Sequence, residues 1–581
     1  MAFAVRVYAL DAVPLRGDEA YSVQHWTATP FTEPWQQLIR EEPAPLGAFT
    51  LYWGWVGAAG RTEFAVRYLS VLGNVAGLAV VLALAKRLLG DWRLALLAGA
   101  LWAVHPLLIW HAQDARVYGV LSLLTPLSFY WLLRALDGRR GGLRPWRPYI
   151  IAQTAALYLY FLEPFWMVAQ ALFVLLCYPD QLRRAIRAWA MVVLLSIPVL
   201  VQLMLVMTVG SYEGNAEPAS LDLLFSHFMP TLLFGDNTVP VWLGLLVALA
   251  LLAGFAGLVR HNRRTGTLLL LWFVVPLLLL VIASFVSDFF RPRYVLMVVP
   301  ALVIGLVGMA AAAVPPRRSA WAAAALVIVI GGVSLTQVWD YFQHDPPKAA
   351  DWPGRVEYLR QRMTPADVLI TGQPDPAAEY YFSGPGALFI IPLDDDAERL
   401  ESDLDRLLER HDSLYLLSDP RTVPTEDYLA QQAQAIPGDT LPGLSQYRRW
   451  RVHPREIAQP LRVAFGDVAV LRGYALLGTE SLLLYWEAGR LTNSDYSVLL
   501  HVERAGEVAP PVAVLDHGVA DAVVSTRTWT PGTIYRDPVA LPPDLPPGEY
   551  VIYTGLYDTA SGAAVGEARY RLATFTVPDA D

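Results

Sequence analysis

The chain has 581 residues, of which 55% are hydrophobic and 17% charged, and its mean hydropathy is +0.37. Ordinary soluble domains contain roughly 45–50% apolar and about 25% charged residues, so this composition excludes a disordered chain, a coiled coil and a wholly soluble enzyme. Residues 1–345 carry 24 basic and 19 acidic residues, whereas residues 346–581 carry 20 and 34. Because this acidic second half has no basic runs, it argues against nucleic acid as a partner.

The first part of the chain predicts a polytopic α-helical membrane protein. Windows long enough to cross about 30 Å of hydrocarbon cover residues 65–88, 92–110, 117–136, 186–208, 239–259, 267–287, 294–314 and 319–339. The apolar stretch 148–178 is split by Glu163-Pro164, which predicts two short spans in a hairpin, and His105-Pro106 predicts a kink. Together these segments predict ten crossings of the lipid bilayer.

The N-terminal residues MAFAVRVYALDAV are too short to cross a bilayer and contain Arg6, yet they precede a loop predicted to be external. We interpret them as the end of a first span, which would give eleven spans in a protein that begins further upstream. The alternative is a short segment that lies at the membrane interface.

The basic residues predict the orientation of the spans. Sixteen of the 24 basic residues of residues 1–345 lie in alternate connections, at 86–93, 134–147, 183–187, 260–264 and 317–318. Short loops rich in Lys and Arg face the cytoplasm. We therefore predict a multi-pass protein of the plasma membrane, with residues 1–64, 111–116, 209–238 and 288–293 outside, together with everything after about residue 340.

The pattern changes after Asp345, and we divide the chain into residues 1–345, 346–452 and 453–581. Residues 346–452 alternate helical stretches with short apolar runs, which predicts a small external α/β domain. Residues 453–581 show period-two runs such as SLLLYWEA and YSVLLHVE between turn residues, which predicts an external β-sandwich. The single cysteine, Cys177, excludes an intrachain disulfide.

Three polar clusters adjoin spans on the predicted external side. They are LRGDEAYS with Asp18 and Glu19, HAQDARVYG with His111, Gln113, Asp114, Arg116 and Tyr118, and SDFFRPRYV with Asp288, Arg291, Arg293 and Tyr294. A single charged residue at a span end is usually an interface anchor. Three clusters on one face instead predict a functional site.

Other polar residues leave alternatives open. Arg67 lies inside a predicted span, where charge is costly and points to function. Glu163 is either a functional acid or a turn residue beside Pro164. His227 and Asp236 either belong to an interfacial helix, which we favour, or form a catalytic pair.

The clusters suit sugar transfer from a lipid phosphate. An acceptor hydroxyl must lose a proton as it attacks the anomeric carbon, so a carboxylate base is needed, and the phosphate leaving group needs the fixed positive charge of arginine. We assign Asp18 as the base and Arg116 and Arg293 as the cations. Glu19, which cannot share a helix face with Asp18, is assigned to metal binding or orientation.

The order of these motifs resembles membrane glycosyltransferases of the GT-C fold, especially family 39 and its bacterial relatives, which include protein O-mannosyltransferases and aminoarabinose transferases. The resemblance covers residues 5–340. The matching elements are the acidic pair Asp18-Glu19, the Pro-rich Glu42-Pro43-Ala44-Pro45-Leu46, which lacks the family's His and one Pro, Arg67-Tyr68-Leu69-Ser70, the turn Gln113 to Tyr118, and Arg293-Tyr294.

The resemblance implies an inverting transfer from a polyprenyl-phosphate sugar to a glycan, lipid or protein acceptor. It implies catalytic roles for Asp18 and Glu19 and phosphate binding by Arg116, Arg293, Arg67, Tyr118 and Tyr294, with Gln113, Asp114 and His111 as further site candidates. The resemblance leaves open whether the reaction uses a divalent metal, Mg²⁺ or Mn²⁺, and Glu19 is the candidate ligand for such a metal.

Two other classes of protein compete with this hypothesis. A lipid-sugar flippase or transporter with external glycan-binding domains should show internal repeats and ionisable residues near the middle of its spans. The sequence shows no internal repeat, and apart from Arg67 its ionisable clusters lie near one surface. A purely structural surface protein would leave the three clusters unexplained.

Overall fold

The structure is a computed structural model of the chain. It describes residues 1–27, 44–138, 142–209, 219–236, 238–285, 290–343, 348–372, 375–392, 396–411, 413–418, 421–436, 443–449, 451–452, 457–507, 510–519 and 525–578. Glu42 and Pro43 of the predicted Pro-rich element, Asp288 of the third cluster, and Arg139 and Arg140 of a predicted cytoplasmic connection lie outside the described residues.

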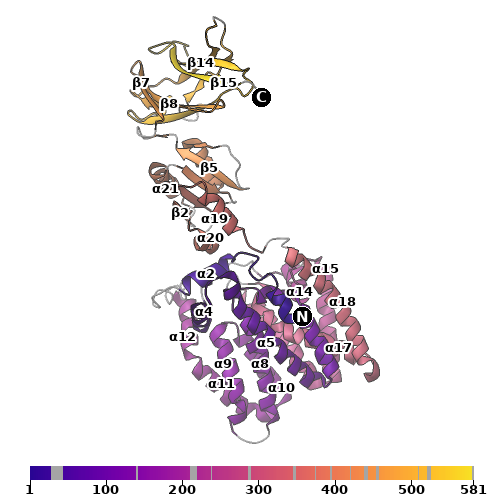
Figure 1. Ribbon diagram of the computed structural model, residues 1–581. Helices are drawn as coiled ribbons and strands as arrows, with labels where there is room; N and C mark the ends of the chain where they lie inside the picture. Colours follow the sequence, from indigo (N-terminus) through magenta and orange to yellow (C-terminus); the bar gives the residue numbers. More distant parts are fainter. Residues whose placement is uncertain are drawn as a thin grey trace. The chain divides into compact units, whose positions relative to one another are not determined.

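The chain forms two compact units. The first contains Met1–Trp352 and Pro376–Tyr380, and the second contains Pro353–Asp375 and Tyr381–Asp581. The described helices of the first unit (Figure 1) are α1 (Ala2–Val7), α2 (Gly17–His25), α4 (Leu46–Ala59), α5 (Glu63–Leu89), α6 (Trp92–Val104), α7 (Pro106–Ala112), α8 (Tyr118–Asp137), α9 (Arg147–Leu159), α10 (Pro164–Cys177), α11 (Leu182–Leu195), α12 (Ile197–Val209), α13 (Leu221–Leu223), α14 (Met229–Phe234), α15 (Val241–His261), α16 (Arg263–Ala283), α17 (Val299–Ala312), α18 (Pro316–Gln343) and α20 (Pro376–Tyr381). Its shorter helical turns are η1 (Arg144–Trp146), η2 (Pro179–Gln181), η3 (Leu224–Phe228) and η4 (Pro292–Val298).

The first unit is a multi-pass membrane protein. Among the described residues, six segments are long and apolar enough to cross a bilayer, namely α5, α8, α15, α16, the continuous stretch Pro292–Ala312, and α18. The number rises to eight if each of two bent helix pairs forms one span. One of these pairs is α6 with α7, which are bent by 59° at His105-Pro106, so the predicted kink is confirmed.

The predicted hairpin at 148–178 is present, but its helices are short. α9 has 13 residues and α10 has 14, so each is about 20 Å long at 1.5 Å per residue. The Glu163 carboxylate at their turn accepts hydrogen bonds from Thr125 (2.9 Å) and Gln153 (3.1 Å). Because Thr125 lies within α8, the turn contacts the interior of a span and not its outer end.

The predicted span 186–208 is also divided. α11 ends at Leu195 and α12 begins at Ile197, with Ser196 between them. Pro198 explains the break, because a proline has no backbone N–H to donate to the preceding turn and its ring crowds that turn.

Small residues bring α5 and α8 into close contact. A Cβ atom on Gly73 would lie 2.6 Å from the carbonyl oxygen of Gly119, and one on Gly119 would collide with the backbone of Ser70. Small residues permit such close packing of membrane helices. This contact places the first half of α5, which carries Arg67, beside the start of α8.

Three of the predicted basic connections, at 86–93, 134–147 and 260–264, meet at one end of the helices. Arg87 at the end of α5 pairs with Asp137 at the end of α8. The Thr265 hydroxyl near the start of α16 donates to the carbonyl of Leu88 at 3.1 Å. These contacts agree with the predicted grouping of the basic connections on a single side of the membrane.

The second unit begins with a mixed sheet. Its strands are β1 (Val368–Thr371), β2 (Ala387–Ile390), β3 (Ser413–Leu417), β4 (Ala433–Ala435) and β5 (Leu444–Arg449), in the order β2-β1-β3-β5-β4. β1 is parallel to β2 and β3, whereas β5 is antiparallel to β3 and β4. Helices α19 (Trp352–Arg360), α21 (Ala397–Arg410) and α22 (Val423–Gln432) alternate with these strands, which confirms the α/β pattern.

Two antiparallel sheets follow. One has the order β6-β13-β9-β8-β7, and the other has the order β11-β10-β14-β15 with β12 on β10. Their strands are β6 (Arg451–Val452), β7 (Gln459–Phe465), β8 (Ala469–Leu477), β9 (Ser481–Ala488), β10 (Tyr496–Arg504), β11 (Ala513–Val514), β12 (His517–Gly518), β13 (Ile534–Ala540), β14 (Gly548–Asp558) and β15 (Tyr570–Val577). One hydrophobic core includes Trp486 of the first sheet and Leu500 and Ile552 of the second. The predicted period-two runs therefore bury one face of each sheet.

Candidate active site

The acidic pair Asp18-Glu19 occupies the first turn of α2. The Glu19 carboxylate accepts the backbone N–H of Arg16 at 3.0 Å, which satisfies a donor that the helix itself cannot pair. Glu19 is thereby turned inward and fully buried, whereas the Asp18 side chain keeps 32% of its surface exposed. The two adjacent carboxylates therefore have different environments.

Glu19 forms a bidentate ion pair with Arg67 of α5. Arg67 Nε donates to Oε1 and Nη2 donates to Oε2, both at 2.8 Å. The backbone N–H of Ala115 also donates to Oε1, at 2.7 Å. Each oxygen thus accepts two N–H groups, and Glu19 joins α2, α5 and the turn before α8.

All the N–H donors of Arg67 form hydrogen bonds within the protein. Beyond the pair with Glu19, Nη1 donates to the carbonyls of Leu10 (2.9 Å) and Val13 (2.6 Å), and Nη2 donates to that of Pro14 (2.8 Å). Its five N–H groups are all paired, so Arg67 has no hydrogen-bond donor left for the predicted contact with a donor phosphate. Arg67 instead fixes the N-terminal segment to α5.

The same geometry does not fit a metal ligand at Glu19. Both of its oxygens are occupied by N–H donors, and the nearest charge is the Arg67 guanidinium. In the part of the chain that the structure describes, no group of three or more His, Cys, Asp and Glu side chains could hold a metal ion.

Asp18 pairs with a different arginine. Arg293 Nη1 donates to Asp18 Oδ2 at 2.9 Å, and Arg116 Nη1 donates to the Asp18 carbonyl at 3.2 Å and to Ser22 Oγ at 2.9 Å. Burial raises the pKa of Asp18, but the positive charges of Arg116, Arg293 and Arg16 outweigh it and hold that pKa below its usual value. Asp18 is therefore ionised at neutral pH.

Asp114 is the centre of a second charged group. Its carboxylate is fully buried and lies 3.1 Å from Arg16 Nη2, 3.0 Å from His111 Nδ1 and 3.1 Å from Lys348 Nζ. Burial raises the pKa of Asp114, yet Arg16, Lys348 and His111 hold it well below the usual range. The carboxylate thus organises the cations Arg16 and Lys348 and the imidazole of His111, which come from three separate segments.

Gln113, Tyr118 and Tyr294 have supporting positions. The Gln113 side chain donates to the carbonyls of Arg6 (3.1 Å) and Tyr8 (2.8 Å) and accepts from the hydroxyl of Tyr341 at 2.6 Å, so it fastens the N-terminal segment to α18.

The two tyrosines lie next to charged site residues. The ring of Tyr118 lies 5.0 Å from that of His111, and the Arg293 guanidinium lies 5.4 Å from the ring of Tyr294.

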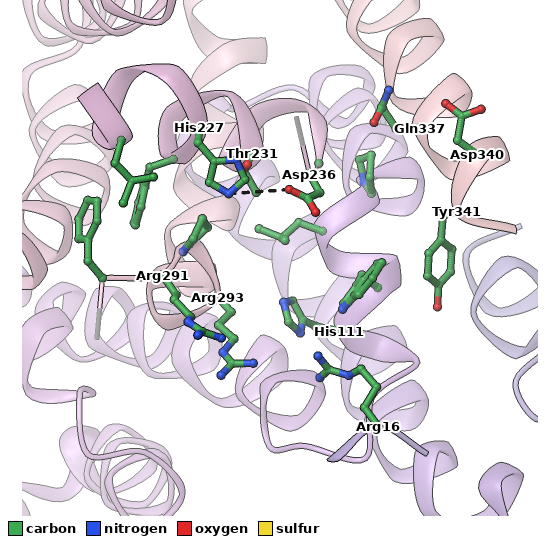
Figure 2. A pocket seen from close by; sticks show the side chains of 18 residues that line it. Arg16, His111, His227, Thr231, Asp236, Arg291, Arg293, Gln337, Asp340 and Tyr341 are labelled. Carbon is green, nitrogen blue, oxygen red and sulfur yellow. Dashed lines mark ion pairs between the residues drawn. The ribbon is translucent and has the colours of Figure 1, made fainter. Parts of the chain in front are cut away.

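A cavity of about 490 Å³ opens beside these groups. Figure 2 shows Arg291 and Arg293 on one flank, Arg16 and His111 on another, and His227, Thr231, Asp236, Gln337 and Asp340 across the cavity from the arginines. His227 and Asp236 lie 3.7 Å apart. The apolar wall is formed by Pro106, Leu107, Trp110, Leu223, Phe228, Phe290 and Pro292.

The structure thus brings together most of the predicted residues. Arg293 connects Asp18 to the cavity, and His111 lines it, whereas Glu19, Arg67 and Asp114 are buried beneath it. Sequence reasoning missed Arg16, Tyr341 and Lys348. Arg16 adjoins the acidic pair, and Lys348 is one of only two lysines in the sequence, but neither fact by itself predicts a site.

The chain was compared with known proteins. No protein-family profile matches it, and no curated protein matches it either. Among solved structures, it is similar to ArnT from Cupriavidus metallidurans bound to undecaprenyl phosphate, with a TM-score of 0.53, 15% identity, and coverage of 77% of this chain and 96% of ArnT. The apo form of ArnT gives a TM-score of 0.54, 14% identity and the same coverage. The chain has the GT-C fold.

A weaker likeness extends to the arabinofuranosyltransferase AftD from Mycobacteria. It covers 100% of this chain and 60% of AftD, at 13% identity and a TM-score of 0.45, and we base no conclusion on it. The predicted fold class is confirmed by the ArnT comparison, whereas membership of family 39 stays a prediction.

Proposed function

We propose that this protein is a membrane glycosyltransferase that transfers a sugar from a polyprenyl-phosphate donor to an acceptor hydroxyl. The observation that carries the proposal is the cavity with three arginines, Arg16, Arg291 and Arg293, beside the carboxylate of Asp18. The fold shared with ArnT, which was solved with undecaprenyl phosphate, supports the choice of lipid.

The charge of the site suits an anionic leaving group. In the described residues around the acidic pair and the cavity, six cations accompany five carboxylates: Arg16, Arg67, Arg116, Arg291, Arg293 and Lys348 against Asp18, Glu19, Asp114, Asp236 and Asp340. Fixed positive charge stabilises the phosphate as its bond to the sugar breaks. The apolar wall with Trp110 and Phe228 offers a surface for the first isoprene units.

The proposed reaction is a single displacement. The acceptor oxygen forms its bond to the anomeric carbon as the bond between that carbon and the phosphate oxygen breaks, so the anomeric configuration inverts. The acceptor proton goes to Asp18, which is ionised and partly exposed. The electron pair of the broken bond stays on the polyprenyl phosphate, which the arginines retain.

The location of the site follows from the sequence. The alternating basic connections support an extracytoplasmic site and an extracytoplasmic second unit in the plasma membrane. The acceptor is a glycan, a lipid or a protein hydroxyl.

The proposal is tested by incubating membranes that contain the protein with a panel of polyprenyl-phosphate sugars. Asp18→Asn keeps the shape of the side chain but removes its capacity to accept a proton, so transfer should fall by roughly 10²–10⁴-fold while donor binding survives. Asp137→Asn is the matched control, because Asp137 also pairs with an arginine but lies at the opposite end of α8. Parental transfer by folded Asp18→Asn protein would refute the assignment.

A further inference from the structure

Lys348 is a buried lysine outside the predicted motifs. It follows α18, in the segment that leads from the last span to the second unit, and its side chain is only 2% exposed. Its ammonium donates to the backbone carbonyl of Gln113 at 2.7 Å and lies 3.1 Å from an oxygen of Asp114. A lysine is rarely buried without a paired charge, and here that charge is Asp114.

Two aromatic rings complete the surroundings of this ammonium. It lies 5.3 Å from the ring centre of Trp110 and 5.7 Å from that of Tyr341, and its Nζ is 3.3 Å from the Tyr341 hydroxyl. Such contacts stabilise a desolvated cation. Trp110 and Tyr341 also line the cavity, so Lys348 lies directly behind one of its walls.

Asp114 connects Lys348 to the cavity. The same carboxylate holds Arg16 and His111, at 3.1 and 3.0 Å, and both of these residues line the cavity. Lys348 itself is not among the residues that line it. Any effect of Lys348 on a ligand is therefore transmitted through Asp114 or through the two aromatic side chains.

We propose that Lys348 is a positioning residue of the donor site, which holds the Asp114 carboxylate ionised and oriented so that Arg16 and His111 face the phosphate. This inference rests on the proposed function. It also means that the segment joining the last span to the second unit completes a site built from the first 120 residues, residues 223–236, residues 290–293 and α18.

Removal of the Lys348 charge should change the pH dependence of the site. Asp114 is faced by the cations Arg16 and Lys348, by the imidazole of His111, by the acids Asp18 and Glu19, and by Arg67, Tyr52 and Tyr341. With Lys348 neutral, one opposing charge is lost and the two neighbouring carboxylates remain. Asp114 should then take up a proton at higher pH and release its hold on Arg16.

The experiment uses the full chain in detergent with undecaprenyl phosphate as the probe. Lys348→Met retains the apolar stem and removes the charge, and it should weaken binding of the probe by about tenfold at neutral pH. It should also move the acidic limb of the binding curve to higher pH. Lys348→Arg, which keeps the charge, should recover most of both losses.

The control is Lys86→Met at the only other lysine, which donates to the carbonyl of Gly90 near the end of α5 and should leave binding unchanged. If Lys348→Met does not fold, Lys348→Gln and Lys348→Arg carry the same comparison between a neutral and a charged side chain. A purely structural role predicts a lower yield of folded protein with parental affinity and pH dependence in the fraction that folds, and that result would overturn the inference.

The two proposals fail in different ways. If the parent binds undecaprenyl phosphate or transfers sugar, and Lys348→Met matches it at every pH, only the role of Lys348 is refuted. If the parent neither binds the probe nor transfers sugar from any donor, the proposed function fails, and the role of Lys348 in the donor site fails with it.

Discussion

The different environments of Asp18 and Glu19 lead to a sharp prediction about Glu19→Gln. Glu19 is fully buried and accepts four N–H groups, two of them from Arg67. A glutamine can accept with one atom only, so its NH₂ group would face an N–H donor of Arg67 and the backbone N–H of either Arg16 or Ala115. The guanidinium of Arg67, which is itself buried, would lose its counter-charge.

The expected cost is large. Removal of one partner from a buried ion pair costs about 3–5 kcal/mol, against about 5–15 kcal/mol for the stability of a typical protein. We therefore expect Glu19→Gln to lower the yield of folded protein and the temperature of thermal unfolding in detergent. Asp18→Asn is the comparison, because an ion pair with a partly exposed partner contributes only about 0–1 kcal/mol.

The assay measures unfolding and transfer for both variants on the same preparation. Glu19→Gln should unfold at a lower temperature than the parent. Asp18→Asn should unfold at the parental temperature but should lose sugar transfer. If Glu19→Gln unfolds at the parental temperature but is inactive, Glu19 acts in chemistry and our structural role for the Glu19–Arg67 pair is wrong.

Three further predictions address the donor phosphate, the topology and the second unit. Arg293→Lys keeps the charge but loses the planar fork, so kcat/KM for the donor should fall by roughly tenfold or more; an unchanged value would exclude Arg293 from phosphate binding. In a chain with Cys177→Ser, a cysteine at the exposed Leu491 should react with an impermeant thiol reagent on intact cells and one at the exposed Arg144 should not; the opposite result would reverse the orientation. A fragment of residues 346–581, which has an acidic excess and no long apolar window, should be soluble when expressed alone, and persistent aggregation would contradict this.

Most of the spans were predictable because long apolar windows follow directly from the bilayer, but ten crossings were predicted, and six segments of the described chain, or eight with the bent pairs, are long and apolar enough to cross. The joint location of Asp18, Arg116 and Arg293 was predictable for the same reason, since alternate connections lie on one face. What was not predictable is which hydrogen-bond partners each side chain has. Arg67 has the sequence context of a phosphate ligand, yet its donors are taken by Glu19 and three backbone carbonyls.

Long-range partners were equally hidden from the sequence. Lys348 lies 235 residues after Gln113, and no periodicity predicts that its segment returns to the site. The sequence predicted the short hairpin but not how far its turn reaches along α8. The contact of Glu163 with Thr125 depends on the length of α9, whose end no single residue determines.

The sequence leaves open whether Glu163 is a functional acid or a turn residue. Its contacts in the structure favour the turn residue. Its side chain is fully buried, and its hydrogen-bond partners in the described chain, Thr125 and Gln153, are both neutral. Gln153 in turn accepts from Gln170 at 3.1 Å, so the acid belongs to a network of amides and hydroxyls that fixes the hairpin against α8.

This assignment predicts opposite results for two substitutions. Glu163→Gln can keep the network, because its amide oxygen can accept from Gln153 and its NH₂ group can donate to the Thr125 hydroxyl, which can rotate, so stability and sugar transfer should stay close to the parental values. Glu163→Leu leaves Thr125 and Gln153 without an acceptor, and at about 1–3 kcal/mol for each unsatisfied buried group it should lower the unfolding temperature clearly. Both variants are measured by thermal unfolding and by sugar transfer. A functional acid requires the reverse, since the loss of its ionisable proton would abolish transfer, so a Glu163→Gln protein that is folded but inactive would return Glu163 to the catalytic site.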